Sequence, residues 1–378
     1  MGDRSFNGKR LEVARAFAGL NQSGLAEKVG VSQSYVCQLE AGTKVPTADL
    51  RAALAVATGF APEFFESEDG VIFQLHECTF RRRKKTPVET QRRLAACGTI
   101  FGSVLTYLLK RIRIPDVNLP SYKVADARDA ERIADTVRMT WGLGLDRPLS
   151  NLVRVAERHG IVTTRFDAGS DQVDAFSRCG SPRPVIVLNS GRGSASRSRF
   201  NVAHEIGHLV LHQGEHSTGD DNQEKPADAF ASAFLMPRAG FLRAFPQTGR
   251  IDWPTVFRLK GHWGASAAAI VRRAYELERI DAIEYRRAYK YMSANGWLRG
   301  EPQEPATEEP EVIVKGLEIL RAKKNETMAS ISRALAISVG AMRQVTGADL
   351  PVVSEAGDVP TNNNVVHLSH AKLRPLSN

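Results

Sequence analysis

The sequence lacks the long apolar runs that mark membrane-embedded or exported proteins. None of its 378 residues lies in a run approaching the roughly 18 uninterrupted apolar residues that a membrane helix needs. Residues 1–5 are polar and lead straight into a helical pattern, with no apolar signal core. We therefore expect a cytoplasmic protein with no membrane partner.

Cysteine is also scarce. The four cysteines, Cys37, Cys78, Cys97 and Cys179, are far apart and form no CxxC pair. This spacing argues against a disulfide framework and against a structural zinc ribbon. Reduced thiols in a cytosol fit the pattern better.

The chain has an excess of positive charge. Its net charge of +9 makes an acidic partner plausible, with nucleic acid as the first candidate, although many basic proteins bind no DNA. The basic run at 81–85 could follow a DNA backbone, but such runs more often form a solvated face. The length exceeds what one hydrophobic core usually serves, so two or three domains are expected.

Hydrophobic periodicity indicates helices on both sides of a short β region. Residues 8–66 have the pattern of several short helices, and residues 88–112 that of one long helix. Glycine- or proline-flanked apolar runs predict strands at 161–166 and 184–189, with 173–177 as a possible third. We find no internal repeat. Further helices are expected within 129–160, 197–213, 223–236, 251–297 and 311–347, with a Pro/Glu linker at 301–311 and an Asn-rich disordered tail after 351.

The most specific motif is H-E-x-x-H, which is formed by His204, Glu205 and His208. Residues four apart share one face of a helix, so both imidazoles can reach the same metal ion. Zinc suits two imidazoles and a carboxylate, with the fourth position left to water. Glu205 lies about 100° round the helix, where it can reach that water as a general base without binding the metal. Chance would produce this pattern about 0.01 times in such a chain.

The helix that carries the motif is apolar apart from one polar stripe. The stripe contains Asn201, His204, Glu205, His208 and His212, within an arc of about 100°. Buried polar groups must be paired, and a metal would satisfy them. The alternative is two core histidines bonded to other groups. His212 is expected to line the cleft or to support a ligand, and Gly207 indicates close packing of a neighbouring element.

A third ligand should come from a nearby element. Glu224 is our choice because it opens the next apolar helix. Asp228 follows one turn later and is either a hydrogen-bond partner of a ligating histidine or a carboxylate favoured by the helix dipole. The other candidates for the third ligand are Glu215, His216, Asp220 and Asp221.

Near the N-terminus, residues 22–41 follow a helix-turn-helix pattern, with Gly30 in the turn and Ser32 as the N-cap of the second helix. The alternative is a helix bundle used for protein contacts. Gln22 could bond a phosphate, and glutamine can bond adenine bidentately. The residues expected to contact DNA are Gln22, Gln33, Ser34, Tyr35 and Gln38.

These motifs resemble two known families. Residues 10–66 are similar to an XRE (Cro/C1-type) helix-turn-helix domain. Residues 183–237 are similar to the ImmA/IrrE metallopeptidase family, through the strand at 184–189, the motif with its preceding Arg199-Phe200, and the segment E-x-x-A-D-x-F-A that begins at Glu224. The resemblance implies a minimal zinc peptidase fold that cleaves or inactivates a partner transcription regulator, often in prophage, mobile-element or stress control. It also supports Glu224 as a ligand. Residues 327–346 have a weaker helix-turn-helix pattern.

The expected fold is multidomain and mainly α, with an α+β zincin-like core, a small antiparallel sheet and a five-helix N-terminal domain. The expected segments are a helix-turn-helix domain at 1–68, a basic and helical linker at 69–128, a zinc metallopeptidase domain at 129–245, a helical extension resembling helix-turn-helix at 246–300, a linker with a small helical module at 301–350, and a disordered tail at 351–378.

The leading hypothesis is a DNA-binding regulator with one zinc ion per chain and a peptidase domain that cleaves another regulator. Its partners would be operator DNA, a protein substrate and a second copy of the chain, because this DNA-binding module generally reads two half-sites. A substrate segment could pair with the strand at 173–177 as a sheet edge. The alternatives are a repressor whose zincin-like domain senses a signal without turnover, and an N-terminal domain that docks proteins.

Overall fold

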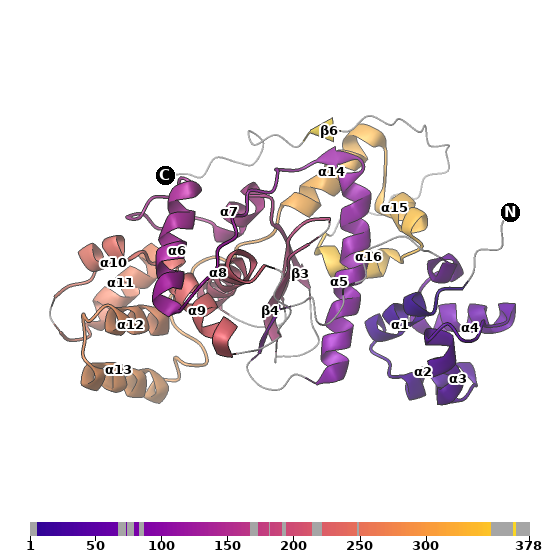
Figure 1. The fold of residues 1–378 in the computed structure, drawn as a ribbon, viewed down its shortest axis with the longest axis horizontal. Helices are drawn as coiled ribbons and strands as arrows, with labels where there is room; N and C mark the ends of the chain where they lie inside the picture. The colour runs from indigo at the N-terminus through magenta and orange to yellow at the C-terminus, as the bar shows by residue number, and fades with distance from the viewer. Residues whose placement is uncertain are drawn as a thin grey trace.

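The computed structural model describes residues 6–66, 73, 79–82, 87–166, 173–180, 182–190, 194–213, 221–247, 249–348 and 366–367. Helices surround one small sheet, and the N-terminal helices form a separate group at one end of the molecule (Figure 1). The mainly α fold predicted from the sequence is therefore confirmed. None of the described helices is both long and apolar enough to cross a bilayer.

The N-terminal group consists of short, well-capped helices. Asn7, Asn21, Ser32 and Thr47 each cap the following helix by accepting a backbone N–H. The elements are α1 (Gly8–Phe17), α2 (Gln22–Val29), α3 (Gln33–Glu40), α4 (Ala48–Thr58) and the 3-10 helix η1 (Pro62–Glu66).

The central sheet contains four strands in the order β1-β4-β5-β3. Their bounds are β1 (Thr79–Arg82), β3 (Val162–Phe166), β4 (Val173–Arg178) and β5 (Val185–Asn189). β4 is antiparallel to both β1 and β5, whereas β3 runs parallel to β5. The expectation of an antiparallel sheet was wrong for β3, because residue alternation identifies a strand but not the side on which it pairs.

Each face of the sheet belongs to a different hydrophobic core. Val162, Phe176 and Val187 pack in one core with α5 (Val88–Leu109), and this core continues into α1. Ile186 and Leu188 pack in the second core. The range 69–128 was predicted to be a linker, but its helix α5 is a packed layer of the fold. Of the basic run, residues 81–82 belong to β1, and residues 83–85 lie outside the described residues.

The second core is formed by helices that cover the opposite face of the sheet. In it, α8 packs on α9, and α9 packs in turn on α6. The helices are α6 (Ala127–Thr140), α7 (Leu152–Arg158), α8 (Ala195–Leu211), α9 (Asp221–Leu235), α10 (Arg238–Ala244), α11 (Trp253–Trp263), α12 (Ala267–Glu276) and α13 (Ala282–Ala294).

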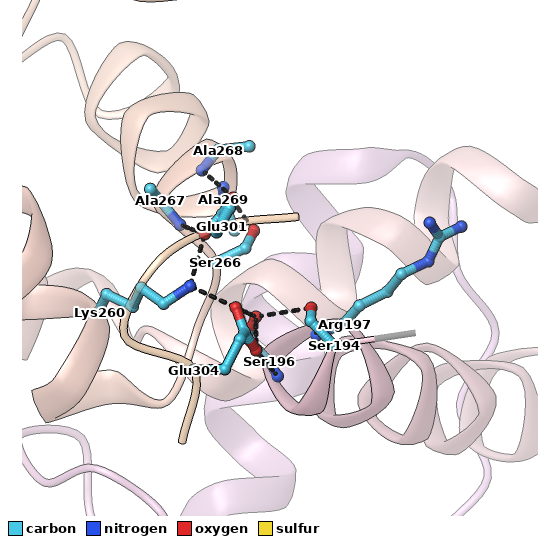
Figure 2. Close-up of polar contacts among 10 residues, drawn as sticks. All are labelled: Ser194, Ser196, Arg197, Lys260, Ser266, Ala267, Ala268, Ala269, Glu301 and Glu304. Carbon is cyan, nitrogen blue, oxygen red and sulfur yellow. Dashed lines mark hydrogen bonds and ion pairs between the residues drawn. The ribbon is translucent and has the colours of Figure 1, made fainter. Parts of the chain in front are cut away.

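The Pro/Glu segment 301–311 is anchored to the fold rather than free, and we call it the acidic strap. Glu301 accepts the backbone N–H of Ala267 at the start of α12, at 2.6 Å, and Glu304 accepts that of Ser196 at the start of α8, at 3.0 Å (Figure 2). The fully buried ammonium of Lys260 donates to both carboxylates. Carboxylates are favoured at helix N-termini, and composition alone could not identify these partners.

The strap leads into α14 (Val312–Lys324), α15 (Met328–Leu335) and α16 (Val339–Thr346). These helices return to the first core, where α14 and α16 pack against α5 and β3. Within the tail predicted to be disordered, only 366–367 are described. They form β6 (Val366–His367), which pairs in parallel with β2 (Ile112–Arg113).

Candidate metal centre

Helix α8 carries the polar stripe into the protein interior. His204 and Glu205 are fully buried, and His208 is 3% exposed. The N-terminus of α8 is fixed by its cap Ser194, which accepts the N–H of Arg197, and by Glu304 of the acidic strap. The local sequence thus forms a helix that buries His204, Glu205 and His208 inside the protein.

Helix α9 brings a carboxylate to the same place. Glu224 Oε2 lies 3.5 Å from His204 Nε2, and Glu224 Oε1 lies 3.5 Å from His208 Nε2. The two Nε2 atoms are 2.9 Å apart. One ligand atom from each of the three residues lies within 4.8 Å of the others, so this cluster could hold a metal ion.

Close packing of α8 on α9 makes this convergence possible. A Cβ atom on Gly207 would lie 3.2 Å from Phe230 Cδ1 and 3.3 Å from the carbonyl oxygen of Ala227. The inference that Gly207 marks a close approach is confirmed, and the approaching element is α9. A larger residue here would separate the histidines from Glu224.

Asp228 lies one turn after Glu224 and contacts the first histidine. Its Oδ1 is 2.8 Å from Nδ1 of His204. A carboxylate there accepts the Nδ1 proton, so the lone pair of Nε2 faces Glu224 and His208. The structure therefore places Asp228 where it orients the His204 ring and selects its tautomer.

Burial and hydrogen bonding set the charge of the cluster. Burial lowers the pKa of His208 to about 4, so its imidazole is neutral at pH 7. Burial alone would raise the pKa of Glu224, but the adjacent imidazoles of His204 and His208 hold it well below its usual range. A neutral imidazole beside an ionised carboxylate is the state that binds a metal.

Glu205, which follows His204 on α8, contacts the sheet. Ser177 on β4 donates a hydrogen bond of 2.5 Å to its Oε2, and both residues are buried. Sequence reasoning did not single out Ser177. The available signal was the alternation along β4, which puts Ala175 and Ser177 on one face, but it did not reveal that α8 covers that face.

The remaining site predictions have different outcomes. His212 caps the C-terminus of α8, its Nε2 lies 3.3 Å from the carbonyl oxygen of Gln223, and its ring centroid is 5.4 Å from that of His208. It thus adjoins the cluster without being one of its three residues. Of the other candidate ligands, Glu215, His216 and Asp220 lie outside the described residues, as does the side chain of Asp221.

The expected substrate edge was wrong. The strand β4 is not at an edge, because β1 pairs with it through Thr79 opposite Ser177 and Phe80 opposite Phe176. The four residues of β1 were missed from sequence because a short run rich in arginine does not have the pattern of a strand. An incoming peptide therefore finds this side of β4 already paired.

The expected DNA-contacting residues gather around α3. Gln22 donates to Glu40 at 2.7 Å and accepts from Gln33 at 2.8 Å, which ties the start of α2 to the start of α3. Ser34 is exposed, whereas Tyr35 and Gln38 are half-buried. Ser32 caps α3 as predicted, and Gly30 adopts the left-handed conformation in the turn at φ 71°.

Comparison with known proteins agrees with this arrangement. Residues 8–64 match a helix-turn-helix domain model, and residues 156–275 match the Peptidase_M78 family model, described as the IrrE N-terminal-like domain. A propionyl-CoA carboxylase regulator from Cereibacter sphaeroides is 25% identical over 318 residues, which cover 75% of this chain and 67% of the relative. Both resemblances drawn from the sequence are confirmed. The chain therefore contains, in this order, a region that matches a helix-turn-helix domain and a region that matches the IrrE N-terminal-like domain of the Peptidase_M78 family.

Proposed function

We propose that the chain is a DNA-binding transcription regulator whose second domain is a zinc-dependent endopeptidase acting on another regulator. The observation that carries the proposal is the convergence of His204, His208 and Glu224, with Glu205 beside them but held on a separate partner. Three protein ligands with an uncoordinated acid nearby is the arrangement of a catalytic zinc site rather than a closed structural one.

The donor set fits zinc. Atoms bonded to one tetrahedral zinc ion at 2.0–2.1 Å lie about 3.4 Å from one another. The 3.5 Å separations between Glu224 and each histidine match this value, whereas the 2.9 Å between the two Nε2 atoms is shorter. His204, His208 and Glu224 would hold the ion, and Asp228 would orient His204.

The chemistry proposed for the site is peptide hydrolysis. A bound zinc ion would supply a water whose pKa is lowered to about 7. Glu205 would serve as the general base that takes a proton from water and returns it to the leaving amine, because it is the acid adjacent to the proposed ligands that is not one of them. Ser177 holds Oε2 of Glu205 and so fixes the direction of its carboxylate. The surrounding core keeps bulk water away from these groups.

The decisive experiment uses Glu205→Gln in the full-length protein. Zinc content, measured by mass spectrometry, should match that of the wild type, while cleavage of regulators encoded beside its gene should be lost. His204→Ala should lose both. Cleavage that persists in the Glu205→Gln variant would remove the peptidase assignment.

The second candidate is a regulator whose zincin-like domain senses a signal without turnover. The pairing of β1 with β4 favours it, because that side of β4 is not open to a substrate strand. The relative's name describes a regulator and says nothing of cleavage. In this case His204→Ala alters DNA binding, Glu205→Gln does not, and no neighbouring protein is cut by either the wild type or the variants.

We further propose that α3 reads operator DNA in a homodimer in the cytoplasm, through Gln33, Ser34, Tyr35 and Gln38, with Gln22 near a phosphate. Because the relative is named a propionyl-CoA carboxylase regulator, we propose genes for that enzyme as targets. A gel shift with the protein's own promoter at low salt tests the proposal, because phosphate contacts are strongest there. A missing shift would instead favour a protein-docking role for this domain.

A further inference from the structure

The first three helices of the chain recur near its end. A constant shift of 306 positions, from Lys9 to Lys315, aligns the segment KRLEVARA at 9–16 with KGLEILRA at 315–322. Five of these eight positions are identical, namely Lys, Leu, Glu, Arg and Ala. The expectation of no internal repeat was therefore wrong, because a single pair of copies separated by hundreds of residues produces no visible period.

The shift also aligns the secondary structure residue by residue. The eight residues of α2 correspond to those of α15, and the eight of α3 to those of α16. The N-caps Ser32 and Ser338 correspond as well. In the turns, Val31 donates to the carbonyl of Ala26 at 3.0 Å, and Ile337 to that of Ser332 at 3.1 Å.

Backbone conformation gives an independent sign of the repeat. Gly19 and Gly30 have φ values of 70° and 71°, and their equivalents Asn325 and Ala336 have values of 55° and 53°. Alanine rarely adopts the left-handed region, which costs it about 1–2 kcal/mol. Its presence at the turn position occupied by Gly30 shows that the turn itself is preserved, even without a glycine.

The two copies bury the same positions against different partners. Val36 and Leu39 of α3 are buried, and so are their equivalents Met342 and Val345 of α16. However, α3 packs on α1 and α2, whereas α16 packs on α5 and β3 as well as α15. Thr164 of β3 donates to the carbonyl of Val345 at 2.6 Å. The sheet and α5 thus pack against α16 where α1 packs against α3 in the first copy.

The outward face of α16 remains at the surface. Ser338 and Gly340 are exposed, as are their equivalents Ser32 and Ser34. The positions of Gln33, Ser34 and Tyr35 are occupied by Val339, Gly340 and Ala341, which have no side-chain donor or acceptor for a base edge. This face cannot read bases at those three positions.

The second copy also carries exposed positive charge on the two helices that precede α16. Arg321, Lys323 and Arg333 are exposed, and none of the three side chains forms an ion pair with the described part of the chain. In the first copy, the equivalent positions hold Arg15, which is buried against Glu40, then Phe17 and the acidic Glu27. The second copy therefore exposes basic side chains at three positions where the first copy has no exposed basic side chain.

We propose that α15 and α16, with the end of α14, form a second helix-turn-helix that binds mainly the phosphate backbone of double-stranded DNA, because Gln344, at the position of Gln38, is the one expected base-contacting side chain that it retains. Exposed lysine and arginine side chains neutralise phosphates and release condensed counterions, which supplies affinity independent of sequence. The first copy would supply sequence recognition and the second would add general affinity.

The test compares two triple variants of the full-length protein. R321A/K323A/R333A removes three exposed charges from the second copy, and R286A/K290A/R299A removes three exposed charges elsewhere. Binding to a fluorescent 30-base-pair duplex of random sequence is followed by anisotropy between 50 and 200 mM KCl. Each lost phosphate contact should reduce the slope of log K against log salt by about 0.9, or by about 2.7 for three contacts.

The expected result is this loss of slope in the first triple variant and an unchanged slope in the control. Equal slopes in the two triple variants would overturn the proposal. The second copy would then be assigned to contacts with proteins rather than with DNA. As a complement, Gln38→Ala should weaken preference for the promoter over random DNA while keeping the salt slope. No cleavage is measured, so the outcome is independent of the peptidase proposal.

Discussion

Ser177 and Glu205 are joined by a hydrogen bond of 2.5 Å between two buried side chains on different elements, β4 and α8. Because the serine fixes the carboxylate that is to move the proton, we expect Ser177→Ala to lower kcat of cleavage by about 10- to 100-fold. KM and zinc content should not change. Ser177→Thr keeps the hydroxyl and should restore most of the rate. Wild-type turnover by the alanine variant would show that Glu205 needs no such support.

Gly207 offers a stability test with a control inside the same chain. Alanine at this position would meet the backbone oxygen of Ala227 at 3.3 Å, so we expect a destabilisation of about 1 kcal/mol after the helix-propensity gain is included. Gly261 in α11 has open space around its Cβ position, so Gly261→Ala should instead stabilise by up to about 1 kcal/mol. Chemical denaturation measures both. Equal effects would mean that α8 and α9 can separate freely.

The buried Glu157 should make stability depend on pH. Burial raises its pKa to about 7, and it accepts N–H groups of Glu311 and Val312 at the start of α14. The carboxyl group of Glu157 therefore binds its proton more tightly in the folded protein than in the unfolded chain. As a result, the free energy of unfolding is highest at low pH and falls as pH rises from about 4.5 to about 7. The loss amounts to at most about 3 kcal/mol.

Glu157→Gln removes this titration while keeping an oxygen to accept the same N–H groups. In urea denaturation, the free energy of unfolding of the variant minus that of the wild type should therefore increase between pH 5 and pH 8. A constant difference across that range would show that the carboxyl group titrates normally despite its burial.

Lys260 is buried between two carboxylates of the acidic strap. Lys260→Met should cost about 3–5 kcal/mol, because Glu301 and Glu304 then keep their charge without a cation. Adding Glu301→Gln and Glu304→Gln removes those charges and should recover much of the loss. Thermal unfolding of the single and triple variants measures this. An equally unstable triple variant would assign the effect to lost packing.

How much of the fold and of the candidate metal centre could be predicted from the sequence depends on how far apart the interacting residues lie in the chain. His204, Glu205 and His208 lie within five consecutive residues of α8, and Glu224 lies in the first turn of the next helix, α9, so local spacing located them together. Ser177 was missed because alternation along a strand says which residues share a face but not which helix covers it. The strap was taken for a linker because its partners, such as Lys260, lie far from it in the sequence.

The unbroken first core has a mechanical consequence. Helix α5 touches α1 at the front of the chain and also packs on the sheet whose other face carries Ser177. Within the described residues, α1 of the N-terminal domain contacts α5 directly, and α5 shares its core with one face of the sheet beside the histidine cluster. A shift of α5 by even a fraction of a turn must be shared by both, which provides a direct route for signals between them.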